Sequence, residues 1–155
     1  MNEIQNINEW RISLLGKIIF ANNFLKDILQ YETQIFEHYE QTKSREARQN
    51  LLKYNTQVES NMMLIVNYLT ELIGNRKSNR YSLYNDIAMK NSVRWRTFYN
   101  DNRSDIYKLI DTRNHLYAHF NPFYANAVKG LPIWFFPLID NAIVVLKDIF
   151  KTTSD

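Results

Sequence analysis

The residues best suited to chemistry in this sequence lie together near position 115. Arg113 is followed by Asn114 and, after four intervening residues, by His119. A guanidinium carries a planar fork of N–H donors that fits phosphate oxygens, and an imidazole exchanges protons near neutral pH. We therefore take Arg113, Asn114 and His119 as the candidate catalytic residues, acting on an anionic substrate.

The position of Arg113 in the expected helix is unusual. A helix is predicted over about 104–120, capped by Ser104 or Asp101 and ended before Pro122, whose preceding residue avoids the α region. Its apolar residues recur with helical spacing: Ile106, Leu109, Ile110, Leu116, Tyr117 and Phe120. The same period assigns Arg113 to this stripe. Since a buried unpaired charge costs several kcal/mol, Arg113 must either pair with a carboxylate or open onto a polar cleft or a partner subunit.

His119 lies at the predicted end of this helix. On an ideal helix it is about 120° around and about 9 Å along from Arg113, so it reaches the same cleft only at its rim. The negative end of the helix dipole favours the imidazolium there, which suits proton exchange. The alternative is a solvated residue at a helix end without any catalytic role.

A metal site is a further alternative. Asp111, His115 and His119 follow one another at intervals of four, a spacing at which one helix face can hold a divalent metal. However, HLYAH lacks the Glu of a metallopeptidase motif, and this face points away from the apolar stripe. A solvated face explains the spacing more simply, so we predict no metal site and no cofactor.

Positive charge gathers in the middle of the chain. The net charge is −2 for residues 1–75, +5 for residues 76–113 and 0 for residues 114–155. The predicted RNA-binding cations are Arg76, Lys77, Arg80, Arg94, Arg96 and Arg103, with Lys90 in the same stretch, and the interleaved aromatics are Tyr81, Tyr84, Trp95, Phe98 and Tyr99. Cations hold phosphates and aromatic faces stack unpaired bases. We expect about half of these aromatic residues to belong to the core instead.

The rest of the sequence predicts the scaffold around these residues. Apolar residues with helical spacing predict long helices over about 3–40 and 44–73, the second closed by a left-handed Gly74, and a last helix over about 136–151. Ser82 is expected to cap a short helix that extends to about Lys90. With the helix of 104–120, this predicts an all-α, up-and-down bundle of four main helices plus short ones, a single domain over residues 1–155.

Composition narrows the remaining possibilities. The 155 residues include no cysteine, which excludes disulfides and thiolate chemistry. The N-terminus lacks the basic leader of a signal peptide, and prolines and polar residues interrupt the longest apolar stretch. We expect a cytoplasmic protein without a membrane span.

The residues around Arg113 resemble a family signature. Arg113-Asn114-x4-His119 followed by Asn121-Pro122 is similar to the Arg-polar-x3–5-His motif of the HEPN superfamily. The segment RNHLYAHF is closest to its abortive-infection branch, and SLYNDI at 82–87 resembles a Ser-Leu-rich segment of that branch. Asn121 stands where a related group carries a modified tyrosine, so that mode of regulation is not expected here.

The resemblance implies a function. HEPN domains of toxin–antitoxin and phage-defence systems form homodimers whose Arg and His residues face one cleft, and the active ones cut RNA without a metal. By this resemblance His119 acts as general acid and base, Arg113 stabilises phosphoryl charge, and Asn114 positions one of these groups. The implied partners are RNA, a second copy of the chain and a cognate antitoxin or other inhibitor. The alternative is a HEPN-like module that binds RNA, a nucleotide or a protein and cuts nothing.

Overall fold

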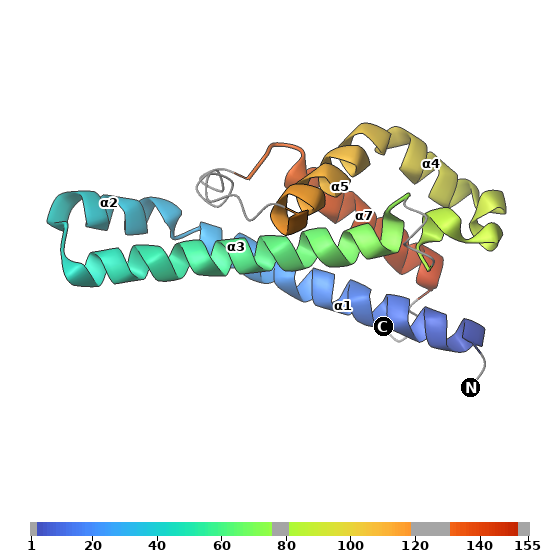
Figure 1. Ribbon diagram of the computed structural model, residues 1–155, viewed down its shortest axis with the longest axis horizontal. Helices are drawn as coiled ribbons and strands as arrows, with labels where there is room; N and C mark the ends of the chain where they lie inside the picture. The colour runs from blue at the N-terminus through green and yellow to red at the C-terminus, as the bar shows by residue number, and fades with distance from the viewer. Residues whose placement is uncertain (1–2, 76–80, 119–130, 152–155) are drawn as a thin grey trace.

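The computed structural model describes residues 3–75, 81–118 and 131–151 (Figure 1). These residues form six α-helices and two short 3-10 helices, and no strand occurs among them. In chain order the elements are α1 (Glu3–Leu29), α2 (Glu32–Thr42), α3 (Arg45–Ile73), η1 (Leu83–Asn85), η2 (Ile87–Asn91), α4 (Val93–Asp101), α5 (Arg103–Ala118) and α7 (Phe135–Phe150). The predicted all-α class is confirmed.

The two longest helices, α1 and α3, run antiparallel and side by side through the molecule (Figure 1). Ser44 caps α3 through its Oγ, which accepts a hydrogen bond from the Ala47 amide at 3.1 Å. The helix ends at Ile73, as the sequence predicts. Gly74 does not take the left-handed conformation that we expected, because its φ of −69° and ψ of 146° are extended.

The predicted single helix over 3–40 is wrong, because it is divided into α1 and α2. Backbone bonds from Gln30 to Asp27 and from Tyr31 to Ile28 tighten the end of α1 into three-residue turns. α2 then continues in roughly the same direction and packs against the first half of α3 (Figure 1). No glycine or proline marks this break, so the sequence carries no local signal for it.

The helices α4, α5 and α7 pack together over the other half of the α1–α3 pair (Figure 1). α4 was not predicted from the sequence, and it is capped by Ser92, whose Oγ accepts from the Trp95 amide at 3.2 Å. Only Asn102 separates α4 from α5, so neither Ser104 nor Asp101 caps α5 as we expected. α7 begins and ends one residue before its predicted limits.

The expected short helix from Ser82 to Lys90 is replaced by η1 and η2. Ser82 precedes η1, but its Oγ donates to the Gly74 carbonyl oxygen at 2.8 Å and does not cap the turn. The Ser82 side chain is fully buried, so this bond ties the chain after the 76–80 segment back to the end of α3. None of the described helices combines the length and the apolarity that crossing a bilayer requires.

Candidate functional site

Arg113 lies on α5 and pairs with a carboxylate of α3. Its Nη2 is 3.0 Å from Oε1 of Glu71, and the two side chains are 21 % and 33 % exposed. The apolar neighbours predicted on the same stripe, Ile106, Leu109 and Ile110, are all buried. Arg113 therefore lies at the edge of the core, where Glu71 neutralises its charge. Its Nη1 is buried, so the exposed part of the side chain does not include that nitrogen.

Glu71 is the functional candidate that sequence reasoning missed. It lies 42 positions before Arg113 on another helix. No local spacing connects the two residues, and only the packing of α5 against α3 brings them together. The sequence left two options for Arg113, a carboxylate partner or an open cleft, and the structure shows the carboxylate.

His115, two residues after Arg113, contacts its own helix. The Nδ1 of His115 lies 2.8 Å from the backbone oxygen of Asp111 and 3.5 Å from its Oδ1, and the His115 side chain is 42 % exposed. This agrees with the solvated face that we predicted for His115. Asn114 is half-buried. His119 lies outside the described residues, although α5 is described as far as Ala118, directly before it.

The alternative of a metal site finds no support in the part of the chain that the structure covers. No group of three or more His, Asp or Glu side chains that could hold a metal occurs among those residues. His119, the third member of the Asp111-His115-His119 set, lies beyond them.

The predicted RNA-binding cations fall into two groups. Arg76, Lys77 and Arg80 lie outside the described residues. The other three are exposed on α4 and the start of α5: Arg94, Arg96 and Arg103. Arg94 is 3.3 Å from a carboxylate oxygen of Asp148, and Arg103 bonds to Asn100 at 3.1 Å while its guanidinium lies 5.6 Å from the centre of the Tyr99 ring.

Most of the aromatic residues in this basic segment build the core. Trp95, Phe98 and Tyr99 are buried, whereas Tyr81 and Tyr84 are 37 % and 45 % exposed. The prediction that about half would be core residues is therefore confirmed. Burial, with a smaller contribution from Tyr107 and Tyr84, raises the pKa of Tyr99 to about 12. Of these five aromatic residues, Tyr81 and Tyr84 are the two with enough exposed surface to stack a base.

Charges of both signs surround the start of α5. A shallow hollow of about 680 Å³ is lined there by Arg103, Lys108, Asp101 and Asp111, together with polar neighbours. Lys108 also pairs with Asp105 at 3.4 Å. The net positive charge of residues 76–113 is therefore not concentrated in this hollow, and a phosphate would meet carboxylates beside the cations.

A second arginine, Arg11 on α1, is buried more deeply than Arg113. Only 6 % of it is exposed. Its Nε and Nη2 donate to the Tyr81 carbonyl oxygen at 2.9 and 2.7 Å, and its Nη1 donates to Oδ2 of Asp86 at 2.9 Å. Arg11 stands on the apolar stripe of its helix, with Ile7 and Leu14 on the same face, so the argument used for Arg113 would have found it too. It joins α1 to the turn before η1 and η2.

The chain has no significant match among protein-family models, curated proteins or solved structures. The likeness to the HEPN superfamily consequently depends on the motif at 113–122, on the segment at 82–87 and on the all-α class. It enters below as a proposal.

Proposed function

We propose that the protein is a HEPN-like endoribonuclease that cuts RNA without a metal, at a site formed by two copies of the chain. The observation that carries this proposal is the position of Arg113. It is held by Glu71 at the edge of the core and remains 21 % exposed on the helix that leads directly to His119. The Nη1 of Arg113 is buried and its Nη2 bonds to Glu71, so a phosphate oxygen would compete with Glu71 for this guanidinium.

The reaction that suits these residues is an internal transfer at phosphorus. His119 takes the proton of the ribose 2′-hydroxyl, and the 2′-oxygen forms a bond to phosphorus. The bond from phosphorus to the 5′-oxygen then breaks, and the departing oxygen receives a proton from the same imidazolium or from that of the second copy. Arg113 stabilises the negative charge that grows on the phosphoryl oxygens, and Asn114 positions one of these groups.

A homodimer is part of this proposal because Arg113 and His119 do not lie on the same face of one straight helix. Arg113 and His119 are about 9 Å apart along an ideal helix, so two helices that meet near Arg113 supply both groups around one phosphate. We expect sedimentation at tens of micromolar to detect a dimer. A sample that contains only monomer would argue against the composite site.

The experiment compares RNA cleavage by the parent protein and three variants, with and without EDTA. His119→Ala should lose most of the activity and keep its fold, since the sequence predicts His119 at the end of a helix, where shortening a side chain removes little packing. Arg113→Ala should lose activity and some stability, because its stem packs at the edge of the core. His115→Ala is the matched control on the same helix, and it should retain activity. Parental cleavage by His119→Ala, or loss of cleavage in EDTA, would refute the proposal.

The second candidate function is a binding module that cuts nothing. The ion pair between Arg113 and Glu71 favours it, because a carboxylate partner gives Arg113 a structural role that requires no substrate. The variant Glu71→Gln separates the two functions. If Arg113 is only structural, Glu71→Gln and Arg113→Ala should lower the melting temperature alike and leave RNA binding unchanged. If Arg113 meets RNA, only Arg113→Ala should weaken RNA binding.

A further inference from the structure

Glu71 is the only charged residue in the second half of α3. Residues 60–73 read SNMMLIVNYLTELI, so its neighbours along the helix are apolar or neutral. It lies in the last turn of α3, where the negative end of the helix dipole disfavours a carboxylate. Arg113 is a charge on an apolar stripe of α5. Both positions are unfavourable for a lone charge, and the ion pair between the two side chains offsets both costs.

This ion pair limits how Arg113 can bind a phosphate. A guanidinium binds phosphate most strongly through two parallel N–H bonds, and Nη2 belongs to both edges that offer such a pair. The Nη2 of Arg113 donates to Glu71 at 3.0 Å, and its Nη1 is buried. A phosphate that makes two bonds must therefore displace the Glu71 carboxylate or share Nη2 with it. Sharing places two anions side by side, where they repel each other.

The burial of the surrounding residues indicates how the pair can open. Fully buried leucines hold both helices in the core: Leu69 and Leu72 on α3 and Leu109 on α5. A shift of either helix would disturb this packing, whereas the Arg113 side chain can rotate about its own bonds. The Glu71 side chain is 33 % exposed, so water can solvate the carboxylate after the arginine leaves. Opening therefore requires a side-chain rotation and strands no buried carboxylate.

We propose that the bond from Arg113 to Glu71 is an autoinhibitory contact, which occupies the guanidinium in the free protein and is released when an RNA phosphate binds. This inference rests on the proposed function, because it takes Arg113 as the residue that meets the phosphate. The phosphate must supply more stabilisation than the carboxylate that it displaces. Glu71 therefore lowers the affinity of the site for RNA.

The test is RNA binding by the full chain, measured as the fluorescence anisotropy of a labelled oligouridylate whose 2′-hydroxyls are methylated so that it cannot be cut. Glu71→Gln removes the charge and retains an oxygen that can accept from Nη2. It should bind this RNA about fivefold more tightly, which corresponds to about 1 kcal/mol, the upper value for exposed ion pairs. Glu59→Gln is the matched control, because it removes the same charge from α3 about three turns before Glu71, and it should bind with parental affinity.

A double-mutant cycle separates the contact with Arg113 from a general effect of charge. In the Arg113→Ala background, Glu71→Gln should tighten binding by less than about twofold, since the guanidinium that it would release is absent. Circular dichroism of each variant establishes that the fold is kept. Glu71→Asp keeps the charge but withdraws the carboxylate by one methylene, so it should tighten binding by about twofold. This variant decides the question if Glu71→Gln does not fold.

Two results would overturn the inference. Parental or weaker binding by Glu71→Gln, or by Glu71→Asp in its place, would mean that Glu71 orients Arg113 for the phosphate and does not withhold it. An equal gain from Glu71→Gln with and without Arg113 would mean that Glu71 only repels RNA at a distance.

Cleavage of unmodified RNA by the same proteins separates this inference from the proposed function. Cleavage without tighter binding by Glu71→Gln would overturn the inference and leave the ribonuclease intact. Tighter binding that depends on Arg113, with no cleavage by any protein, would support the autoinhibitory contact and overturn the ribonuclease. If none of the proteins binds the RNA, both proposals are wrong.

Discussion

The two ends of the α1–α3 pair differ in how they are packed (Figure 1). At the core end, α4, α5 and α7 cover the pair, and each of them contributes buried apolar side chains such as Phe98, Leu109 and Leu138. At the hairpin end, where α2 and the first half of α3 lie, α2 and the end of α1 are the described elements that pack on α3, and α2 has no buried residue. Ala47, Tyr54 and Val58 are the buried side chains that α3 contributes there.

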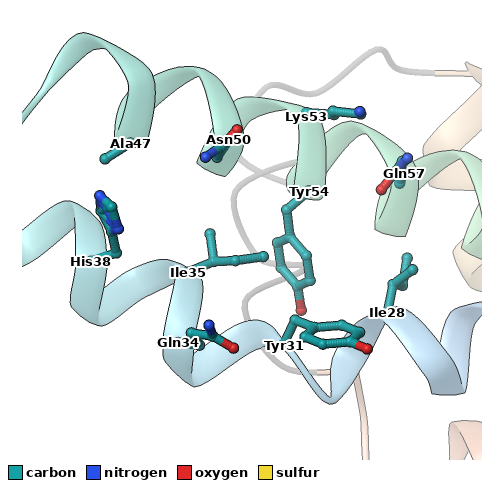
Figure 2. A pocket seen from close by; sticks show the side chains of 10 residues that line it. All are labelled: Ile28, Tyr31, Gln34, Ile35, His38, Ala47, Asn50, Lys53, Tyr54 and Gln57. Carbon is teal, nitrogen blue, oxygen red and sulfur yellow. The ribbon is translucent and has the colours of Figure 1, made fainter.

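The hydrogen bonds of two buried residues at the core end contrast with a buried hydroxyl at the hairpin end. At the core end Arg11 makes three hydrogen bonds to groups across the fold, and Ser82 bonds to Gly74. At the hairpin end Tyr54 lines a cavity between α2 and α3 (Figure 2), and its hydroxyl has no partner among the described residues. One buried atom at the core end, Oδ1 of Asn22, also lacks a partner among the described residues. The contrast therefore concerns the bonds of Arg11 and Ser82 and the hydroxyl of Tyr54, and not every buried polar group.

The largest expected effect comes from removing the guanidinium of Arg11. Arg11→Met should lower the free energy of unfolding by roughly 3–5 kcal/mol, because it leaves Asp86 and the Tyr81 carbonyl without their buried partner. Urea denaturation followed by circular dichroism measures the change. Arg48→Ala, an exposed substitution at the start of α3, is the control and should alter stability by less than about 0.5 kcal/mol. A loss below about 1 kcal/mol for Arg11→Met would show that this network contributes little.

A pair of leucines on α3 tests the contrast in packing directly. Leu69 is fully buried at the core end, whereas Leu52 is 56 % exposed at the hairpin end. Leu69→Ala should lower the free energy of unfolding by about 2–5 kcal/mol, since it removes buried methyl groups and leaves a cavity. Leu52→Ala should change it by less than about 0.5 kcal/mol. Equal effects in urea denaturation would contradict the difference between the two ends.

Substitution of two buried tyrosines should give the smallest changes in the free energy of unfolding. Tyr99 at the core end lies close enough to Tyr107 and Asn75 for both to influence its pKa, whereas the Tyr54 hydroxyl has no described partner. Tyr99→Phe should therefore lower the free energy of unfolding by about 1 kcal/mol. Tyr54→Phe should leave it unchanged or raise it slightly. Destabilisation by Tyr54→Phe would mean that its hydroxyl is satisfied by another group.

The loss of stability at alkaline pH is a second measurement on Tyr54 and Tyr99. Burial is the first cause of a pKa raised from its ordinary value of 10 to about 12 for both Tyr54 and Tyr99. Between these values the unfolded chain loses the tyrosine proton and the folded chain keeps it, so the folded state becomes less stable as the pH rises from 10 to 12. Each Tyr→Phe variant should reduce this loss. Ultraviolet titration of tyrosinate should show one late-titrating group fewer in each variant.

Local patterns in the sequence determined much of the secondary structure. The limits of α3 and α7 follow from helical spacing, from the Ser44 cap and from Gly74, because these signals act within a turn or two of chain. The same spacing predicted that Arg113 lies on an apolar stripe. A charged residue in that position needs a carboxylate partner or a polar opening. The sequence also indicated that part of the aromatic residues among the arginines would be buried.

Only the tertiary structure decided which residues meet. Glu71 and Arg113 are 42 positions apart, and Arg11 and Asp86 are 75 apart, so neither pair has a spacing that a helix period could reveal. The break between α1 and α2 has no glycine or proline to mark it, and the cavity beside Tyr54 depends on how α1, α2 and α3 pack together. Helix formation depends on neighbours within a few residues. Ion pairs and hydrogen bonds between helices, and the cavities between them, depend on how whole helices pack, and no short stretch of sequence encodes that packing.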